Sequence, residues 1–477
     1  MFKKYNIAIH TILLSIISIS LFTLYSFSNK YLNSNTSDTI YILGMTIYGF
    51  FILLCFLFSK NSFYGVSSFI ITFLFCEKGF TSYYNMSLLT NLFILSLLGF
   101  IIHLFKYKPH LYLGHYTLST IIFLFSISLS GLFVKEYDSI FQVSTPWFML
   151  PLVLLLGLSL ILLLNYFECT NESSIYDISI YFKSFIILIL YEFLFYLIFD
   201  LNFDINLFFQ NKHYFNGIGS PNTVAIILQL TIPFMLYFSF KYHKLINSIF
   251  FYLNYLLIIL TMSRGAIFIT TLLSIIYYIY LFIRNKTDYK NNLLYHIPTT
   301  ITFILFILIF TLTNKEAVSS FNKIMFSNLN QFNGREPLWR YVLEHWSINP
   351  IFGIGIVSNS YWHLDNFNFQ FAHSTILHTL FMTGLLGLLG LFIHLLDKYT
   401  YIYKTKKYTS LFIMFYLYSG IYGLIDVTYY NIHYTLILLV IMYFYSSYIN
   451  NTNKDSIFNL FSYSNDNKYK DTILNIY

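Results

Sequence analysis

The chain has 477 residues, of which 57% are hydrophobic, 22% aromatic and only 10% charged. This composition excludes an ordinary soluble protein, because so few charged residues cannot cover so much apolar material in water. The formal net charge of +7 is spread over short loops rather than gathered into one basic domain. It therefore indicates the charge asymmetry of membrane loops and not nucleic-acid binding. We predict an all-α, polytopic membrane protein.

Apolar stretches long enough to cross a bilayer recur along the chain. A spanning helix needs about 20 largely apolar residues, and on that scale the sequence predicts fourteen helices. The stretch 245–283 counts as two of them, because basic residues flank both ends and the chain must return to the same side. The predicted helices are 5–27, 40–58, 62–80, 87–105, 111–134, 146–167, 178–199, 221–240, 245–261, 264–283, 295–313, 374–396, 408–424 and 431–448.

The basic residues also predict how the helices are oriented. Cytoplasmic loops carry an excess of Lys and Arg, and this rule places both termini in the cytoplasm. The 200–220 loop, the 261–265 turn and the long 314–373 loop then share the extracytoplasmic side. We expect this side to carry the function, because all the unusual segments meet there.

Three parts of the chain follow from this pattern. Residues 1–200 are N-terminal transmembrane helices. Residues 201–448 form a second transmembrane region that includes the long extracytoplasmic loop. Residues 449–477 are rich in Asn, Asp, Lys and Ser and are expected to form a cytoplasmic tail.

The sequence Ser220-Pro221-Asn222 begins one helix on the extracytoplasmic side. Ser220 is typical of an N-cap and Pro221 of the first helical position, so a well-formed helix start is the simpler interpretation. The functional interpretation is an anion site, because free amide groups and the positive dipole end attract phosphate. Asn222 would then belong to the binding site.

Arg264 follows Ser263 at the extracytoplasmic end of another helix, where the orientation rule disfavours positive charge. One interpretation is an arginine that extends its charge to the interface, with Ser263 as the helix cap. The other is an arginine that faces the bundle and pairs with an anionic ligand. We favour the second, because charges embedded in membranes are costly and tend to mark substrate paths.

The long extracytoplasmic loop contains an amphipathic helix. After Pro337, apolar residues recur at three- and four-residue steps, and the tryptophans among them suit the membrane interface. Arg335 precedes this helix and Arg340 lies on it, and planar guanidinium groups can fork onto phosphate oxygens. We expect Arg335 to contact a ligand. For Arg340 both a ligand contact and an ion pair with Glu344 stay open. Trp339 is suited to stacking on a sugar.

His373 stands at the mouth of the helix predicted over 374–396. In the simpler interpretation Ser374 is an N-cap and His373 solvates the start of the helix. In the sharper one His373 is a general base at the boundary between water and lipid. Its extracytoplasmic position, close to the outer arginines, favours the second.

Four histidines in or just after the long extracytoplasmic loop raise the question of a metal site. No pair of them has the i, i+4 spacing of a helical metal motif, and no acidic pair with DxD spacing faces the extracytoplasmic side. The three cysteines form no CxxC motif. We therefore expect neither a metal nor another cofactor. The histidines are His345, His363, His373 and His378.

Taken together, these segments resemble the O-antigen ligase and O-antigen polymerase superfamily of bacterial envelope polysaccharide enzymes. The resemblance runs from Gly219 to about Phe444. Its motifs are Pro221-Asn222, Ser263-Arg264-Gly265, Arg335 and Trp339 followed by Pro350, Gly353 and Gly355, and His373-Ser374 followed by Gly384 and Gly387.

The resemblance implies a metal-independent glycosyltransferase with a GT-C-like membrane fold. Its donor would be a glycan on undecaprenyl pyrophosphate at the extracytoplasmic face of the bacterial cytoplasmic membrane. Arg264 and Arg335 would neutralise the pyrophosphate leaving group, and His373 would deprotonate the acceptor hydroxyl. The substrate-binding residues would be Arg340, Ser263, Asn222, Trp339 and Ser374.

The acceptor stays open at this point. The helix count favours a polymerase for O-antigen or capsule repeat units, which would join one lipid-linked unit to another and work beside a flippase and a chain-length regulator. The alternative is a ligase that transfers the glycan to lipid A core or to protein. A transporter of lipid-linked glycan is more remote, because it needs polar residues at mid-membrane in several helices and only Glu192 stands out.

Overall fold

The structure is a computed structural model. It describes residues 7–31, 34–59, 63–75, 86–107, 117–131, 175–210, 220–242, 245–284, 289–326, 335–354, 363–364, 367–368, 372–405 and 408–428, together with 437 and 441. The predicted helix 146–167 lies outside these residues, as does nearly all of the predicted helix 431–448. Gly355 and the 449–477 tail also lie outside them.

Six of the helices that the structure describes are long and apolar enough to cross a membrane. This agrees with a multi-pass membrane protein. Helices are the expected solution in an apolar medium, because a helix satisfies its backbone hydrogen bonds within one segment. The N-terminal helices are α1 (Ile7–Tyr31), α2 (Ser34–Phe58), α3 (Phe63–Phe75), α5 (Met86–Tyr107), α6 (Thr117–Gly131) and α8 (Ile175–Phe199).

The second half contains the short α9 and the helices that surround the predicted site residues. The stretch 245–283 forms two helices with the turn at 261–263, as predicted. The helices are α9 (Ile205–Gln210), α10 (Pro221–Tyr242), α11 (Leu245–Leu260), α12 (Arg264–Arg284), α13 (Tyr289–Thr313), α14 (Lys315–Phe326), α15 (Arg335–Trp346), α16 (Thr375–Thr405) and α17 (Thr409–Ile425). A two-stranded antiparallel hairpin joins β1 (His363–Leu364) to β2 (Phe367–Asn368).

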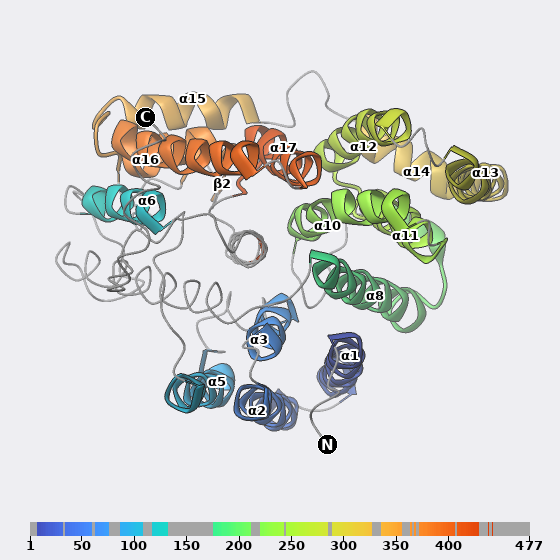
Figure 1. The fold of residues 1–477 in the computed structure, drawn as a ribbon, viewed down its shortest axis with the longest axis horizontal. Coiled ribbons are helices and arrows are strands. Elements are labelled where there is room, and N and C mark those ends of the chain that lie inside the picture. The colour runs from blue at the N-terminus through green and yellow to red at the C-terminus, as the bar shows by residue number, and fades with distance from the viewer. Residues whose placement is uncertain are drawn as a thin grey trace, which may run out of the picture.

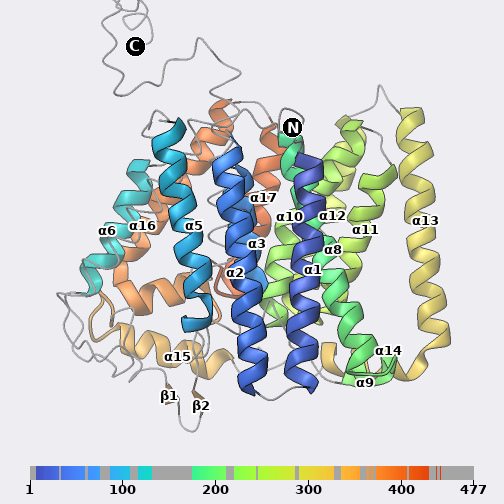
Figure 2. The same ribbon diagram turned by 90° about the horizontal axis from the view of Figure 1, so that it is seen from below.

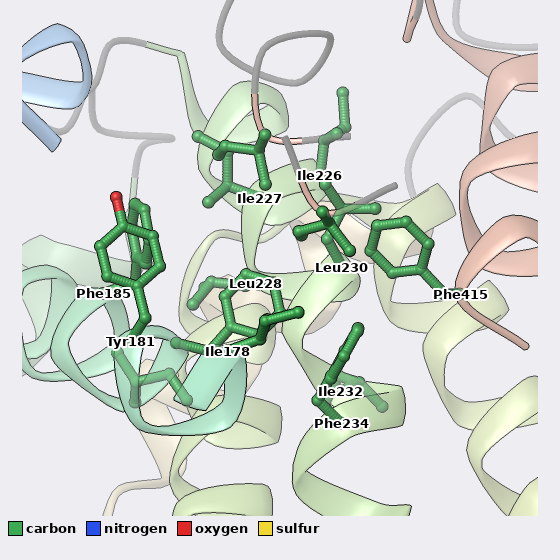
Figure 3. Packing of buried hydrophobic residues seen from close by; sticks show 14 of the residues in the cluster. Ile178, Tyr181, Phe185, Ile226, Ile227, Leu228, Leu230, Ile232, Phe234 and Phe415 are labelled. Atoms are coloured by element: carbon green, nitrogen blue, oxygen red, sulfur yellow. The ribbon is translucent and has the colours of Figure 1, made fainter. Parts of the chain in front are cut away.

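Helix α10 is the centre of this half of the bundle. Of its most apolar window 94% is buried inside the protein, against 6% for α13 at the edge (Figure 1). Figure 3 shows how α10 is enclosed: Leu228 and its neighbours pack between Phe185 of α8 and Phe415 of α17. A helix that is apolar all round is stable in a protein core or in lipid, and α10 lies in the core, where its neighbours hold it in one place.

Helices α9, α14 and α15 gather at one end of the bundle, opposite the start of α1 (Figure 2). Helix α14 was not predicted, because its 12 residues are too few and too polar to span a membrane. It packs against α9 instead. Phe208 and Phe209 of α9 and Ala317 of α14 form a small buried cluster with Met262, which lies in the turn between α11 and α12. This cluster supports the turn that carries Ser263 and Arg264.

Candidate active site

Four helices begin around the C-terminal end of α17, and each is linked to it by a hydrogen bond or by a short chain of them. The starts of helices leave backbone amide groups unpaired and carry the positive end of the dipole. Their convergence therefore favours a negatively charged ligand. The four helices are α10, α12, α15 and α16, which begin at Pro221, Arg264, Arg335 and Thr375.

His373 and Asp426 form a pair at this meeting point. The Nδ1 atom of His373 lies 3.3 Å from Oδ1 of Asp426, and the histidine side chain is 40% exposed while the aspartate side chain is 10% exposed. The carboxylate also accepts a hydrogen bond of 2.8 Å from the Val427 N–H. The aspartate is thus held from inside, and the histidine reaches towards solvent.

The surroundings of Asp426 keep it ionised. Burial raises the pKa of its carboxyl, but the hydrogen bond and charge of His373 lower it, as do the Val427 N–H and the charge of Arg335. The pKa therefore lies below its ordinary value. An ionised Asp426 accepts the Nδ1–H of His373, which leaves Nε2 as the proton acceptor of the ring. That is the arrangement a general base requires.

The backbone of His373 is held in an unusual conformation. Its φ of 48° is left-handed, which is uncommon for a residue other than glycine. The residues on both sides fix it: the Ala372 carbonyl accepts a 2.9 Å hydrogen bond from Nε1 of Trp339, and the Thr375 hydroxyl donates to the Asp426 carbonyl at 3.2 Å. Ser374 caps α16 weakly, because its Oγ lies 3.5 Å from the Leu377 N–H. Strain of this kind tends to persist where function needs it.

The glycine motif after α15 locks into a kink of α16. Gly384 has φ 63° and ψ −162°, which are not helical. The Leu385 N–H therefore donates a hydrogen bond of 2.9 Å to the Pro350 carbonyl instead of the Phe381 carbonyl one turn earlier. The freed Phe381 carbonyl accepts the Ile354 N–H at 2.9 Å. Gly353, with φ 70°, lies against the same kink. Two motifs that are separate in sequence therefore form one joint, which connects α15 to the helix that follows His373.

Arg335 and Arg264 lie near the His373–Asp426 pair. Nη1 of Arg335 donates to the Ile425 carbonyl at the end of α17, a favourable place for a cation. Its charge acts on both Arg264 and Asp426. Arg264 is the first residue of α12 and is half-buried. Two neighbouring positive charges repel each other, and an anionic ligand between them would offset the repulsion.

Ser263 and Asn222 join the same network. The Ser263 hydroxyl lies 2.9 Å from Oδ1 of Asn222 and 3.2 Å from the hydroxyl of Tyr422, and Tyr422 donates to Oδ2 of Asp426 at 3.3 Å. Ser220 caps α10, because its Oγ accepts the Thr223 N–H at 3.2 Å. The turn of the Ser-Arg-Gly motif is thus connected to the His373–Asp426 pair through side chains.

Residues 249–392 match the O-antigen ligase family. Over this region the chain is similar to the O-antigen ligase and polymerase superfamily. The match confirms the resemblance expected from the motifs, and members of this family are glycosyltransferase-like enzymes. A search of curated proteins finds no match to the chain.

The O-antigen ligase match includes Arg264, Arg335 and His373, whereas Asn222 and Asp426 lie outside its limits. Among the described residues, Asp426 and Tyr422 are site components that the sequence reasoning missed. The rule that singled out Arg264 would also have found Asp426, because this acidic residue ends an apolar helix at the membrane boundary. Nothing in the local sequence distinguishes Tyr422 from the other tyrosines of α17.

Arg340, for which two interpretations stayed open, forms an ion pair with a residue other than Glu344. Its ion pair runs to Glu336, at 3.5 Å, and not to Glu344, and both side chains of the pair are mostly exposed. The two residues stand four positions apart on α15, which places them on the same face. Arg340 therefore has a described partner away from the His373–Asp426 pair.

His378 is buried one turn inside α16, and its Nδ1 lies 3.5 Å from the Ala372 N–H. His378 therefore packs inside the protein and forms a hydrogen bond there. Within the described part of the chain, no group of three or more His, Cys, Asp or Glu side chains is arranged to hold a metal ion.

Proposed function

We propose that the protein transfers a glycan from undecaprenyl pyrophosphate to a hydroxyl group on the extracytoplasmic side of the bacterial cytoplasmic membrane. The observation that carries the proposal is the His373–Asp426 pair beside Arg335 and Arg264, at a point where four helices begin. A base and fixed positive charges near the leaving group are the two parts this reaction needs.

The proposed reaction begins at the acceptor hydroxyl. Nε2 of His373 takes its proton while the oxygen attacks the anomeric carbon of the donor, so that a new C–O bond forms. Asp426 keeps Nδ1 protonated and stabilises the imidazolium that results. The bond from the anomeric carbon to the phosphate oxygen breaks, and its electron pair leaves with the pyrophosphate.

Arg264 and Arg335 are proposed to receive the leaving group. The pyrophosphate gains negative charge as the anomeric bond breaks, and fixed positive groups stabilise that charge. An arginine has five N–H donors, so Arg335 can keep its bond to the Ile425 carbonyl and still contact a phosphate. Trp339, Ser374, Asn222 and Arg340 remain proposed substrate contacts.

We favour a polymerase, in which the acceptor is another lipid-linked repeat unit of an O-antigen or a capsule. The second candidate is a ligase that transfers to lipid A core or to protein, and the family description as O-antigen ligase supports it. In both cases the proposed fold is GT-C-like with fourteen helices and both termini cytoplasmic. The segments 146–167 and 431–448, which are predicted as helices and lie outside the described residues, would complete that count.

Purified protein in lipid nanodiscs tests the proposal. It is incubated with a defined undecaprenyl-pyrophosphate oligosaccharide, first alone and then with lipid A core. A ladder of longer glycans from the donor alone identifies a polymerase, and a product only with lipid A core identifies a ligase. Movement of the donor across a liposome membrane with no new glycosidic bond would instead identify a transporter and contradict the proposal.

A further inference from the structure

Tyr422 lies in the last turn of α17, and the proposed reaction gives it no part. Its side chain is buried, with 2% of the residue exposed. Its hydroxyl donates to Oδ2 of Asp426 at 3.3 Å and lies 3.2 Å from Oγ of Ser263. We infer that Tyr422 is a positioning residue that couples the Ser263–Arg264 turn to the His373–Asp426 pair. This inference rests on the proposed function.

The contacts place Ser263 in the same role. Ser263 is buried, with 2% exposed, so its hydroxyl faces protein partners and not an open site. Those partners are Oδ1 of Asn222 at 2.9 Å and the Tyr422 hydroxyl. A continuous line of side-chain contacts therefore runs from the start of α10, through the start of α12 and the end of α17, to His373.

A count of protons shows where each hydroxyl donates. Ser263 and Tyr422 each have one hydroxyl proton. Ser263 donates its proton to Oδ1 of Asn222 at 2.9 Å, and Tyr422 donates its own to Oδ2 of Asp426 at 3.3 Å. The two hydroxyl oxygens lie 3.2 Å apart, so each hydroxyl fixes the position of the other. The carboxylate then has Oδ2 held by Tyr422, while Oδ1 accepts the Val427 N–H and faces Nδ1 of His373.

Gly265 allows α12 to approach α17 closely enough for Ser263 to contact Tyr422. A Cβ atom at Gly265 would lie 2.2 Å from Cδ1 of Ile425 and 3.7 Å from Cε2 of Tyr422. Each of the three residues in the Ser263-Arg264-Gly265 motif thus has a different role. Ser263 contacts Tyr422, Arg264 carries the charge, and Gly265 permits the close packing of α12 on α17.

The expected consequence is a fixed geometry between the base and Arg264. His373 acts on the acceptor and Arg264 on the leaving group, which lie on opposite sides of the reacting carbon. Misplacement of about 1 Å can cost such a reaction on the order of 100-fold in rate. The titratable groups that face the pair are Arg335 from α15, His378 from α16 and Tyr422 itself.

The test compares Tyr422→Phe with Tyr418→Phe. Tyr418 lies one turn earlier on α17, is also fully buried, and its hydroxyl lies 2.7 Å from Oγ of Ser274 on α12. Each variant removes one buried tyrosine hydroxyl that contacts a serine, Ser274 in α12 or Ser263 just before it, but only Tyr422→Phe removes a contact to Asp426. Glycan transfer is measured from acid to alkaline pH, with thermal unfolding of each variant as the fold control.

We expect Tyr422→Phe to lower kcat by about tenfold or more with little change in KM for the donor. The acid limb of its pH profile should move to higher pH, because a carboxylate that has lost a donor holds the proton on His373 more tightly. Tyr418→Phe should keep the wild-type profile. Equal rates and equal pH profiles in the two variants would overturn the inference.

Two further measurements test the role of Tyr422 if the first comparison gives no answer. If Tyr422→Phe does not fold, Ser263→Ala interrupts the same line outside α17, and a wild-type rate and pH profile in that variant would overturn the inference. A wild-type protein that forms no glycosidic bond contradicts the proposed function instead. In that case the NMR titration of the His373 ring decides, and an equal titration in wild type and Tyr422→Phe would overturn the coupling itself.

Discussion

The imidazole Nδ1 of His373 lies 3.3 Å from Oδ1 of Asp426, although the two residues stand 53 positions apart in the chain. His373 precedes the first turn of α16, and Asp426 follows the last turn of α17. The bond therefore joins the mouth of one helix to the end of another. The helices that carry Arg264, Arg335 and Asn222 also begin around this hydrogen bond. The His373–Asp426 contact therefore lies at the centre of the candidate site.

Removing either member of this pair should abolish glycan transfer. We expect His373→Gln to lose activity by about 100-fold or more, because no base remains. We expect Asp426→Asn to lose on the order of 100-fold or more, because an amide can favour the wrong tautomer of His373. Asp38→Asn, at an exposed position of α2, is the control. Long glycans made by His373→Gln at normal protein level would contradict the assignment.

Asp426 should also contribute to stability in a way that depends on pH. Its pKa is lowered in the folded protein, so the contribution is present above the unfolded pKa and is lost as the pH falls through the folded one. The unfolding temperature of Asp426→Asn should therefore lie below that of wild type at neutral pH. The gap should shrink below pH 3.8, the ordinary value. A gap that stays constant through that range would show that the ionised form is not the stabilising one.

The two arginines are expected to act on the leaving group. Arg264→Ala and Arg335→Ala should each reduce kcat by about 100-fold or more, and the lysine variants by less, because lysine keeps the charge but loses the planar fork. Arg284→Ala is the matched control, since Arg284 ends the same helix that Arg264 begins and bonds only locally to Tyr280 in the described contacts. Equal activity of Arg264→Ala and Arg284→Ala would remove Arg264 from the mechanism.

The joint between Gly353 and Gly384 should tolerate no side chain. A Cβ on Gly384 would lie 2.3 Å from the Ile351 carbonyl oxygen, and one on Gly353 would lie 2.5 Å from the Met382 carbonyl carbon. Both contacts are with backbone, which cannot move aside, and both residues have positive φ. We expect Gly384→Ala and Gly353→Ala to lower the unfolding temperature and to abolish activity.

Gly420→Ala is the control for this joint, because a Cβ there would meet only the Tyr399 hydroxyl, at 3.9 Å. It should unfold and react as wild type does. If Gly384→Ala matched Gly420→Ala in both measurements, the joint would not be what positions His373.

Much of the fold follows from the sequence alone. Helix spans come from local hydropathy, so the predicted limits 264–283 fall within one residue of α12, and the predicted 178–199 ends with α8 and begins three residues after it. The division of 245–283 into two helices, α11 and α12, followed from charge at its two ends. The amphipathic α15 followed from the three- and four-residue spacing of its apolar residues. Helix α14 was missed because hydropathy over a long window does not register a short surface helix.

The candidate site was only partly predictable. His373, Arg264 and Arg335 stand out because each puts charge or hydrogen-bonding capacity at a membrane boundary, where it is costly. Asp426, Tyr422 and the contact of Gly353 with Gly384 depend on segments that pack together across long stretches of chain. Local spacing records which residues share a helix face, but not which helix ends meet. The sequence by itself therefore determined the helices and the reactive residue types, and only the tertiary packing around α17 decided which of them act together.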